Sequence, residues 1–441
     1  MHQAEHTGTI KKLEARFKDR SARVGILGLG YVGLPLAVEF GRRGYRVTGF
    51  DVSPQRVRDV RRGRSYVSDV DSRDLARLVR SRFLKAEERF DALSEQDAVV
   101  ICVQTPMRKT KEPDISNIVA AVREIAGRMR RSPLVVLEST TYPGATEEII
   151  LPELQKGGRR LGRDFFLAFS PERVDPGNPV YKIANTPKVV GGADPASTRL
   201  ASALYAQVIT KVVPVSSTRA AEVVKLLENT FRAVNIALVN EVALICHRLG
   251  LDAWEVIGAA ATKPFGFMPF YPGPGIGGHC IPKDPQLLSW KMKTLNFDPR
   301  FIQLASTVNG SMPEHTVRRI AALLNEDRKA LKSSAILVLG AAYKPGIEDY
   351  RESPSLDVMD LLLQAGAKVR YHDRFVPRLE VRGRTLRSVP LTDAALRSAA
   401  CVVILTAHAG IDYKNVVRRA RRVFDARNAT RGLISKNLQR L

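Results

Sequence analysis

Residues 22–33 read ARVGILGLGYVG, a short apolar run that ends in the glycine pattern GxGxxG. A helix-like segment, LPLAVEFGRRG, follows at 34–44, and a second apolar run, YRVTGFD, ends at Asp51. A strand, a glycine turn, a helix and a second strand ending in an acidic residue form the fingerprint of a dinucleotide-binding unit. The glycines permit a tight turn and let a pyrophosphate approach the helix N-terminus. The sequence therefore predicts an α/β fold that begins with a Rossmann domain.

The same turn indicates which dinucleotide is bound and where. Asp51 lies about twenty residues beyond the glycines, where it would accept a hydrogen bond from the ribose 2′-hydroxyl and repel a 2′-phosphate. This favours NAD over NADP, although Arg56 tempers the preference because a nearby arginine can accommodate a phosphate. The turn residues expected against the cofactor are Gly28, Leu29, Gly30, Tyr31, Val32 and Gly33.

Three more apolar runs, at 97–106, 133–140 and 164–172, each turn polar at the C-terminal end. In open α/β sheets ligands bind outside those ends of the strands. A single polar residue there is normally a cap or a turn residue, but four in succession favour one shared crevice. These four residues are Thr105, Ser139, Thr140 and Glu172.

A long helical stretch follows. From about Ser216 apolar residues recur at helical spacing until Gly250 ends the pattern. Lys225, Asn229 and Arg232 stand at positions i, i+4 and i+7, so they share one face of this helix. Because the helix is so apolar, we expect Lys225 to line a cleft rather than to be a solvated surface lysine.

Residues 263–285, KPFGFMPFYPGPGIGGHCIPKDP, are too rich in glycine and proline for regular structure. A loop of this length inside a compact domain is usually functional, and this one contains Cys280. The other cysteines, Cys102, Cys246 and Cys401, lie in apolar runs and are expected to be buried packing residues. The four cysteines form no CxxC pair, so neither a zinc site nor a disulfide framework is expected.

A second doubly wound unit is predicted from about Lys332. SAILVLGAAYKPG is a strand that runs into a glycine turn, a helix follows at 354–365, and AKVRYHD is a strand that ends at Asp373. The runs AACVVILTA and RRVFDA supply later strands. Because no full GxGxxG is present, this unit is expected to hold something other than a second dinucleotide.

Length, composition and charge narrow the class of protein. A chain of 441 residues exceeds one typical core, so two or three domains are expected. The polar residues 1–20 predict an extra helix or a frayed tail, and no apolar run is long enough for a membrane helix, so a cytoplasmic protein is expected. The net charge of +24 could indicate nucleic-acid binding, but the arginines are scattered and no basic helix interleaved with aromatics occurs. We therefore expect neither a nucleic-acid nor a membrane partner.

Together these segments resemble the UDP-glucose/UDP-N-acetylhexosamine 6-dehydrogenase family, from about residue 22 to 430. The resemblance implies an N-terminal extension, an NAD domain, a central helical dimerisation domain with the cysteine loop, and a C-terminal domain for the UDP-sugar. The corresponding ranges are 1–20, 21–213, 214–320 and 321–441. The segments that carry the resemblance are GLGYVGLPLA, ESTTYPG, SPERVDPGN, AEVVKLLENTFRAVNIALVNE, GPGIGGHCIPKDP and YKPGIEDYRESPS.

The resemblance also implies roles for individual residues. Cys280 matches the nucleophile, Lys225 and Asn229 the helix residues that stabilise the oxyanion and position the substrate, and Asp284 and Thr140 the residues that order the catalytic water. Glu172 matches the acidic group at the end of its strand. Implied contacts to the nucleotide sugar are Glu172, Lys225, Asn229, Tyr271, Gly277, Tyr343, Lys344 and Arg427. Implied contacts to the cofactor beyond the glycine turn are Asp51, Arg56, Thr105, Ser139, Thr140, Lys283 and Arg351, and no metal is expected.

Two departures bear on the substrate. Many UDP-glucose dehydrogenases have a second glutamate four residues after the one at Glu172, where this chain has Pro176 beside Asp175. The arginine that reaches across from the partner subunit in that subgroup has no match here, Lys263 being the nearest basic residue. Both departures resemble the branch that acts on UDP-N-acetylhexosamines, and UDP-GlcNAc is the expected substrate ahead of UDP-ManNAc and UDP-glucose.

Oxidation of an alcohol to an acid removes two hydrides, and a thiolate can hold the intermediate aldehyde as a thiohemiacetal that is then oxidised to a thioester. Lys225 and Lys283 are candidate cations for ionising Cys280. Asp284 or Glu172 would take the proton from the hydrolytic water.

Three other interpretations of these residues remain. His279 could form a dyad with Cys280, although neighbouring side chains in an extended loop point apart. A two-electron 3-hydroxyacid dehydrogenase would explain the Rossmann start but not the cysteine loop, and a non-enzymatic NAD- or nucleic-acid-binding protein would explain only the charge.

Overall fold

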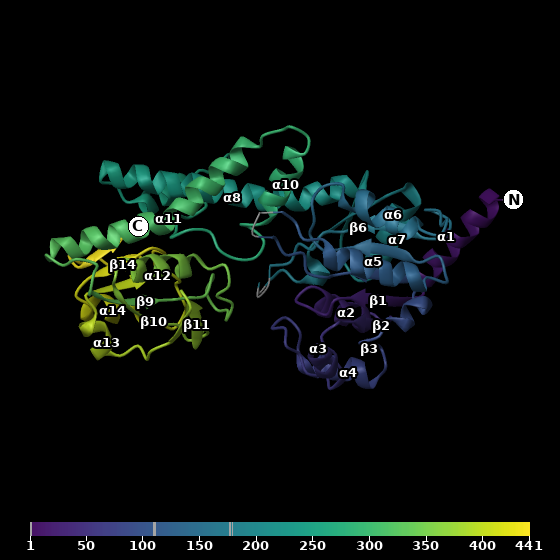
Figure 1. Ribbon diagram of the computed structural model, residues 1–441, viewed down its shortest axis with the longest axis horizontal. Coiled ribbons are helices and arrows are strands. Elements are labelled where there is room, and N and C mark those ends of the chain that lie inside the picture. Colours follow the sequence, from purple (N-terminus) through teal and green to yellow (C-terminus); the bar gives the residue numbers. More distant parts are fainter. Residues whose placement is uncertain (1, 109–111, 176–177, 179) are drawn as a thin grey trace. The chain divides into compact units, whose positions relative to one another are not determined.

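The computed structural model describes residues 2–108, 112–175, 178 and 180–441 (Figure 1). These residues form two compact units, each of which is described by itself. The first runs to Glu228 and includes Trp290–Asn296, and the second comprises Asn229–Ser289 and Phe297–Leu441. Since residues 214–320 do not separate as a third compact body, the expected division into three domains stays a prediction.

The first unit contains an eight-stranded sheet in the order β3-β2-β1-β4-β5-β6-β7-β8. Strands β1 to β6 are parallel and have the Rossmann order, which confirms the predicted fold class. Strand β7 is antiparallel to β6, and β8 is parallel to β7. The strands are β1 (Arg23–Leu27), β2 (Arg46–Phe50), β3 (Leu84–Glu87), β4 (Ala98–Ile101), β5 (Leu134–Leu137), β6 (Phe166–Phe169), β7 (Lys188–Gly192) and β8 (Val212–Val215).

Helices cover this sheet because its central strands are apolar on both faces, as in AVVI of β4 and LVVL of β5. Several helices begin at a side-chain cap, for example at Ser53 before α3 and Asp194 before α7. The helices are α1 (His2–Lys18), α2 (Gly33–Arg42), α3 (Pro54–Arg61), α4 (Ser72–Arg80), α5 (Ser116–Arg128), α6 (Leu151–Gln155) and α7 (Pro195–Tyr205), with short helical turns η1 (Asp91–Glu95), η2 (Thr146–Ile150) and η3 (Ile183–Asn185).

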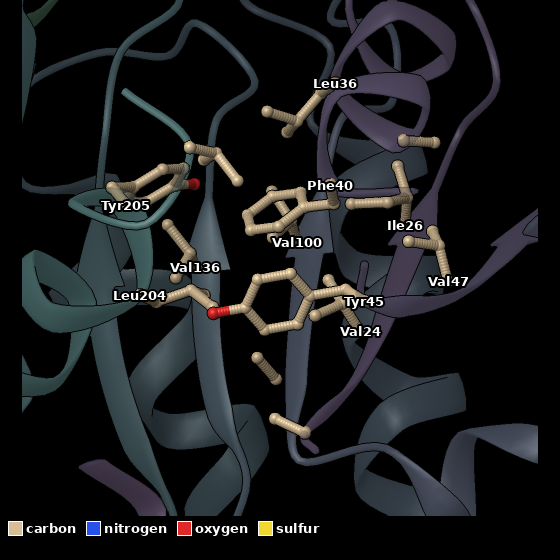
Figure 2. Close-up of a cluster of buried hydrophobic side chains, with 14 of the residues drawn as sticks. Val24, Ile26, Leu36, Phe40, Tyr45, Val47, Val100, Val136, Leu204 and Tyr205 are labelled. Carbon is tan, nitrogen blue, oxygen red and sulfur yellow. The ribbon is translucent and has the colours of Figure 1, made fainter. Parts of the chain in front are cut away.

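The first unit has two buried hydrophobic clusters, and the larger one contains the apolar residues of α2 and α7. Figure 2 shows the rings of Phe40, Tyr45 and Tyr205 near one another in this cluster. The Phe40 ring centroid lies 5.4 Å from that of Tyr45 and 6.3 Å from that of Tyr205. The Tyr45 hydroxyl donates to the Phe17 carbonyl of α1 at 2.5 Å. Phe17 is completely buried in the same core, so α1 is a packed helix rather than a frayed end.

The second unit contains a five-stranded parallel sheet in the order β10-β9-β13-β14-β15 and an antiparallel hairpin of β11 and β12. This confirms the predicted second doubly wound unit. Its strands are β9 (Ala335–Leu339), β10 (Lys368–His372), β11 (Arg378–Val381), β12 (Arg384–Arg387), β13 (Cys401–Ile404), β14 (Val423–Asp425) and β15 (Leu438–Arg440). Its helices are α9 (Ala253–Ala260), α11 (Arg300–Glu326), α12 (Pro354–Gln364), α13 (Asp393–Ser398) and α14 (Tyr413–Arg419).

Two helices belong to both units, namely α8 (Thr218–Leu249) and α10 (Asp284–Lys293). Helix α8 ends before Gly250, which has a φ of 70° and so allows the chain to leave the helix, as the sequence predicted. No helix or strand occurs between Ala260 and Asp284. The cysteine loop is therefore irregular, as its glycines and prolines predicted.

Candidate active site

The glycine turn between β1 and α2 is closed on one side and open on the other. Gly28 has a φ of 92°, and a Cβ atom there would lie 2.6 Å from the Cys102 carbonyl oxygen. A Cβ on Gly33 would lie 1.9 Å from the Gly28 carbonyl oxygen. A Cβ on Gly30 would meet no atom within 4 Å. Gly28 and Gly33 thus shape the turn, and Gly30 leaves room for a pyrophosphate at the N-terminus of α2.

Asp51 holds this turn from the end of β2. One carboxylate oxygen accepts from the Leu29 backbone N–H at 2.8 Å and lies 3.4 Å from an Arg56 guanidinium nitrogen. The other oxygen accepts from the Ser53 backbone N–H at 2.8 Å. The expected pair of Asp51 and Arg56 is therefore formed in the structure, beside a turn in which Leu29 is buried and Tyr31 is exposed.

The ends of β4 and β5 are tied together by two of the expected crevice residues. The Thr105 hydroxyl donates to the Thr140 carbonyl at 2.7 Å, and the Ser139 hydroxyl donates to the Val103 carbonyl at 2.7 Å. These bonds bring Thr105, Ser139 and Thr140 to one edge of the sheet, as the sequence predicted. Both hydroxyl groups donate to backbone carbonyls, so these residues help to fix the backbone at this edge of the sheet, whether or not they also touch a cofactor.

A buried ionic cluster lies beside this edge, and sequence reasoning did not identify it. Its members are Glu138, Glu172, Lys188 and Tyr205. Lys188 Nζ lies 2.9 Å from a Glu138 carboxylate oxygen and 3.7 Å from one of Glu172. Burial raises the pKa of Glu138, although the Lys188 ammonium opposes this. Sequence reasoning missed Lys188 because β7 was not recognised as a strand.

Lys225 reaches the same edge from α8. Its ammonium donates to the Glu172 carbonyl at 2.5 Å, and the residue is 9% exposed. Lys225 is therefore buried next to Glu172, which agrees with a cleft position rather than a solvated surface. Arg173 is held by Glu228 of α8 at 2.6 Å, which fixes the chain just after Glu172.

In the second unit, the cysteine loop turns sharply at two glycines. Cβ atoms on Gly277 and Gly278 would lie 3.0 and 3.1 Å from side-chain atoms of Tyr343, so these glycines allow Tyr343 to lie against the loop. Cys280 follows and is exposed. Its carbonyl accepts from the Asp284 backbone N–H at 2.8 Å, which closes the turn into α10.

Asp284 begins α10 and is almost fully buried. Its carboxylate accepts from the Asn229 side-chain amide at 2.5 Å, so two expected catalytic residues are in direct contact. Lys283 forms an ion pair with Glu352 at 3.7 Å.

His279 contacts an acidic side chain. Its Nε2 lies 3.0 Å from an Asp349 carboxylate oxygen, and Arg351 donates to both oxygens of Asp349 at 2.9 and 2.8 Å. Burial would raise the pKa of Asp349, but the hydrogen bonds from Arg351 and His279 hold it well below its ordinary value. The ring of His279 is thus directed to the loop after Tyr343, where Arg351 also lies.

The remaining expected substrate residues are placed as follows. Arg427 donates through Nε to the Leu405 carbonyl at 2.9 Å, and a Cβ on Gly273 would lie 2.4 Å from its guanidinium. Burial lowers the pKa of Arg427 to about 10. Tyr271 is exposed and stacks on Trp254 with a centroid separation of 5.7 Å, so its ring has a packing partner. Lys344 follows Tyr343 in the turn after β9.

Two features are absent from the described residues. They contain no group of three histidine, cysteine or acidic side chains arranged to bind a metal. In the same residues, no helix has both the length and the apolar character needed to cross a bilayer.

Comparisons with known proteins agree with this geometry. Models of the UDP-glucose/GDP-mannose dehydrogenase family match the chain in three parts, the NAD binding domain at residues 22–209, the central domain at 219–311 and the UDP binding domain at 337–432. The UDP-N-acetyl-D-glucosamine 6-dehydrogenase of Pseudomonas aeruginosa is 35% identical over 81% of this chain and 84% of that protein. The chain belongs to the UDP-glucose/GDP-mannose dehydrogenase family.

Two further relatives extend the comparison. The UDP-N-acetyl-D-mannosamine dehydrogenase of Pyrococcus horikoshii is 36% identical over 80% of this chain and 84% of that protein. A solved structure of a UDP-D-ManNAc dehydrogenase from the same organism has a TM-score of 0.86 and 32% identity, covering 95% of this chain and 98% of that one. Membership of the family confirms NAD as the cofactor and a UDP-sugar as the substrate of a 6-dehydrogenase.

Proposed function

We propose that this dehydrogenase oxidises the C6 alcohol of a UDP-N-acetylhexosamine to the carboxylate, with UDP-GlcNAc as its best substrate. Two relatives at 35 and 36% identity are named for UDP-N-acetyl sugars, one for the glucosamine and one for the mannosamine form. The two sequence departures support the same class, although Pro176 lies outside the described residues. Lys263, at the other departure, lies over the ring of Phe265 at 5.0 Å.

The observation that carries the mechanism is the placement of Cys280 on an exposed turn, with Asp284 buried at the start of the next helix. The exposed side chain is accessible to a substrate carbonyl, and Asp284 is held by the Asn229 amide. We assign Cys280 as the nucleophile, Asp284 as the base that activates water, and Asn229 as the group that orients Asp284. Lys225 is assigned to stabilise the oxyanion. Glu172 is assigned as the second residue that can accept the proton from water.

The proposed reaction consists of two oxidations at C6 followed by a hydrolysis. NAD⁺, when bound, accepts the hydride in each of the two oxidations. The Cys280 sulfur adds to the C6 aldehyde left by the first oxidation and forms a thiohemiacetal, and loss of the second hydride from C6 leaves a thioester. Water, deprotonated by Asp284 or Glu172, attacks the thioester carbon, and the thiolate leaves. One alcohol, two NAD⁺ and one water thus give one carboxylic acid, two NADH and two protons.

The test is to count NADH formed per sugar consumed, over a panel of UDP-GlcNAc, UDP-ManNAc, UDP-GalNAc and UDP-glucose. We expect two NADH per sugar and the highest kcat/KM with UDP-GlcNAc. A ratio of one would favour the two-electron dehydrogenase, and faster turnover of UDP-glucose would refute the substrate assignment alone.

The same assay on two cysteine variants tests the nucleophile. Cys280→Ala should lower kcat by about 10³-fold or more, since it removes the group that forms the covalent intermediate. Cys246→Ala is the matched control, because Cys246 is buried in α8 and should leave the rate per folded molecule unchanged. If Cys280→Ala still yields two NADH per sugar at a normal rate, the covalent mechanism is wrong.

We further propose that a second copy of the chain covers one face of α8. Phe231, Leu238 and Ile245 are 46, 56 and 50% exposed, and they occur at every seventh position of the helix. This heptad spacing is typical of helices that pair along an apolar seam. Leu238→Arg should convert a dimer into a monomer in light scattering, whereas Arg248→Ala on the same helix should not. A wild-type monomer would refute the proposal.

A further inference from the structure

We propose that Lys188 is a positioning residue for this reaction: it fixes the carboxylate of Glu172, and Glu138 and Tyr205 fix Lys188. The proposal rests on the catalytic role proposed for Glu172. In this proposal Lys188 acts through Glu172 and does not touch the substrate. Lys188 is also not part of any glycine or cysteine motif.

The reversal of β7 explains why a lysine occurs here. Strand β7 is antiparallel to β6, with Phe169 paired to Gly191 and Ala168 to Gly192. Lys188 is the first residue of β7, so it lies at the end of the sheet where β6 ends and Glu172 follows. If β7 continued the parallel direction, its first residue would lie at the opposite edge of the sheet.

Lys188 lies between two carboxylates. Its ammonium is 2.9 Å from Glu138 and 3.7 Å from Glu172, and its side chain is only 6% exposed. The side chains of Glu138 and Glu172 are 0 and 15% exposed. A buried lysine is stable only when it is paired, because removing an ammonium from water is costly. The two carboxylates therefore share one cation, and the shorter distance favours Glu138.

Both oxygens of the Glu172 carboxylate are consequently engaged. One accepts from the backbone N–H groups of Arg173 and Val174 at 2.7 and 2.6 Å, and the other faces Lys188. The Glu172 carbonyl accepts from Lys225, so the backbone of the same residue is also held. This arrangement fixes the direction of the carboxylate, which is what a base that must reach one water requires.

The rest of the cluster is closed and does not conduct protons to solvent. The Tyr205 hydroxyl donates to the second oxygen of Glu138, and the Tyr205 ring lies 5.2 Å from Lys188 Nζ. Glu138 and Tyr205 are 1 and 0% exposed, so the chain of contacts ends inside the core. Cys102 also faces the cluster, and burial raises the pKa of its thiol well above the ordinary value. A positioning role fits this closed network, and a proton relay does not.

The alternative is that Lys188 merely neutralises Glu138. Lys188→Met alone cannot decide between the two, because it leaves Glu138 buried without a cation and is expected to unfold the protein. The double variant Lys188→Met/Glu138→Gln removes both charges, and the amide oxygen of the introduced glutamine can still accept from Tyr205. Its thermal unfolding should confirm a folded protein. Glu138→Gln alone removes the competing carboxylate, so that Lys188 pairs with Glu172 only. Glu172→Gln is the reference for loss of the proposed base.

The measurements are kcat and KM with the UDP-sugar that the wild type turns over fastest. We expect the double variant to lose about 10- to 100-fold in kcat with little change in KM, because a small misplacement of the base has that effect. Glu138→Gln, which keeps the cation beside Glu172, should lose less of its kcat than the double variant.

A folded double variant with wild-type kcat would overturn the proposal. Full activity of Glu172→Gln would refute the role of Glu172 itself. An inactive Glu172→Gln with an unaffected double variant would refute Lys188 alone.

Discussion

Replacing Glu222 with glutamine should remove a pH dependence of stability near neutrality. Glu222 lies in α8 and is completely buried. One of its oxygens accepts from the Gly144 N–H at 2.5 Å, and the other accepts from the N–H and hydroxyl of Thr146 at 3.0 and 2.6 Å. Burial raises the pKa of Glu222 from 4.5 to about 7, although these three hydrogen bonds oppose the rise.

The magnitude follows from the shift. A pKa of about 7 in the folded protein against 4.5 in the unfolded chain means that the folded state binds the proton more tightly. This stabilisation is complete below pH 4.5 and is lost as the pH rises to about 7. At about 1.4 kcal/mol per unit, the wild type should lose about 3 kcal/mol of unfolding free energy over this interval relative to Glu222→Gln.

The assay is urea unfolding of both proteins from about pH 5 to pH 8. The Trp290 ring packs against Tyr142 at a tilt of 55°, with a centroid separation of 4.9 Å, so its fluorescence reports this region. A Trp254→Phe background removes the other tryptophan. Glu147→Gln is the control, because it removes a neighbouring, partly exposed carboxylate and leaves Glu222 in place. A constant difference between wild type and Glu222→Gln across the range would show that the three donors cancel the effect of burial, and would refute the reasoning.

Two further predictions concern the carboxylates that follow the second strand of each sheet. Asp51→Ala should weaken NAD⁺ binding about tenfold or more in titration calorimetry and leave NADP⁺ binding no weaker, because a charged hydrogen-bond acceptor is worth about 1.5–3 kcal/mol; wild-type use of NADP⁺ as well as NAD⁺ would contradict it. For Asp373, burial would raise the pKa, but the His408 ring and backbone N–H groups lower it from 3.8 to about 2. The resulting stabilisation, about 2 kcal/mol, is present above pH 3.8 and is lost as the pH falls towards 2, so Asp373→Asn should abolish that part of the acid unfolding curve followed by circular dichroism.

The sequence predicts those parts of the site that are formed by residues close together along the chain. Gly28, Gly33 and Asp51 belong to one strand–turn–helix–strand unit, so their spacing alone predicts the turn that the structure contains. Lys225 was assigned to a cleft because its helix is so apolar, and it is buried.

The parts that sequence does not predict depend on contacts between distant segments. Lys188 meets Glu138, fifty residues earlier, only because β7 runs against β6, and strand direction leaves no mark in the sequence KVVGG. His279 contacts Asp349, which lies seventy residues further along the chain. Cys102 was expected to be buried packing, and it is half-buried at the end of β4 beside the ionic cluster.

Asp51 follows β2 and Asp373 follows β10, and the two carboxylates differ in how many lone pairs are not used by hydrogen bonds within the protein. Asp51 receives the N–H groups of Leu29 and Ser53 and one contact from Arg56. Asp373 receives four backbone N–H groups and Nε2 of His408, which exceeds the roughly four acceptor sites of a carboxylate. Asp51 can therefore still accept from a ribose hydroxyl, whereas Asp373 is saturated by its own chain. Introducing glycines into the turn after β9 would therefore not by itself create a second dinucleotide site.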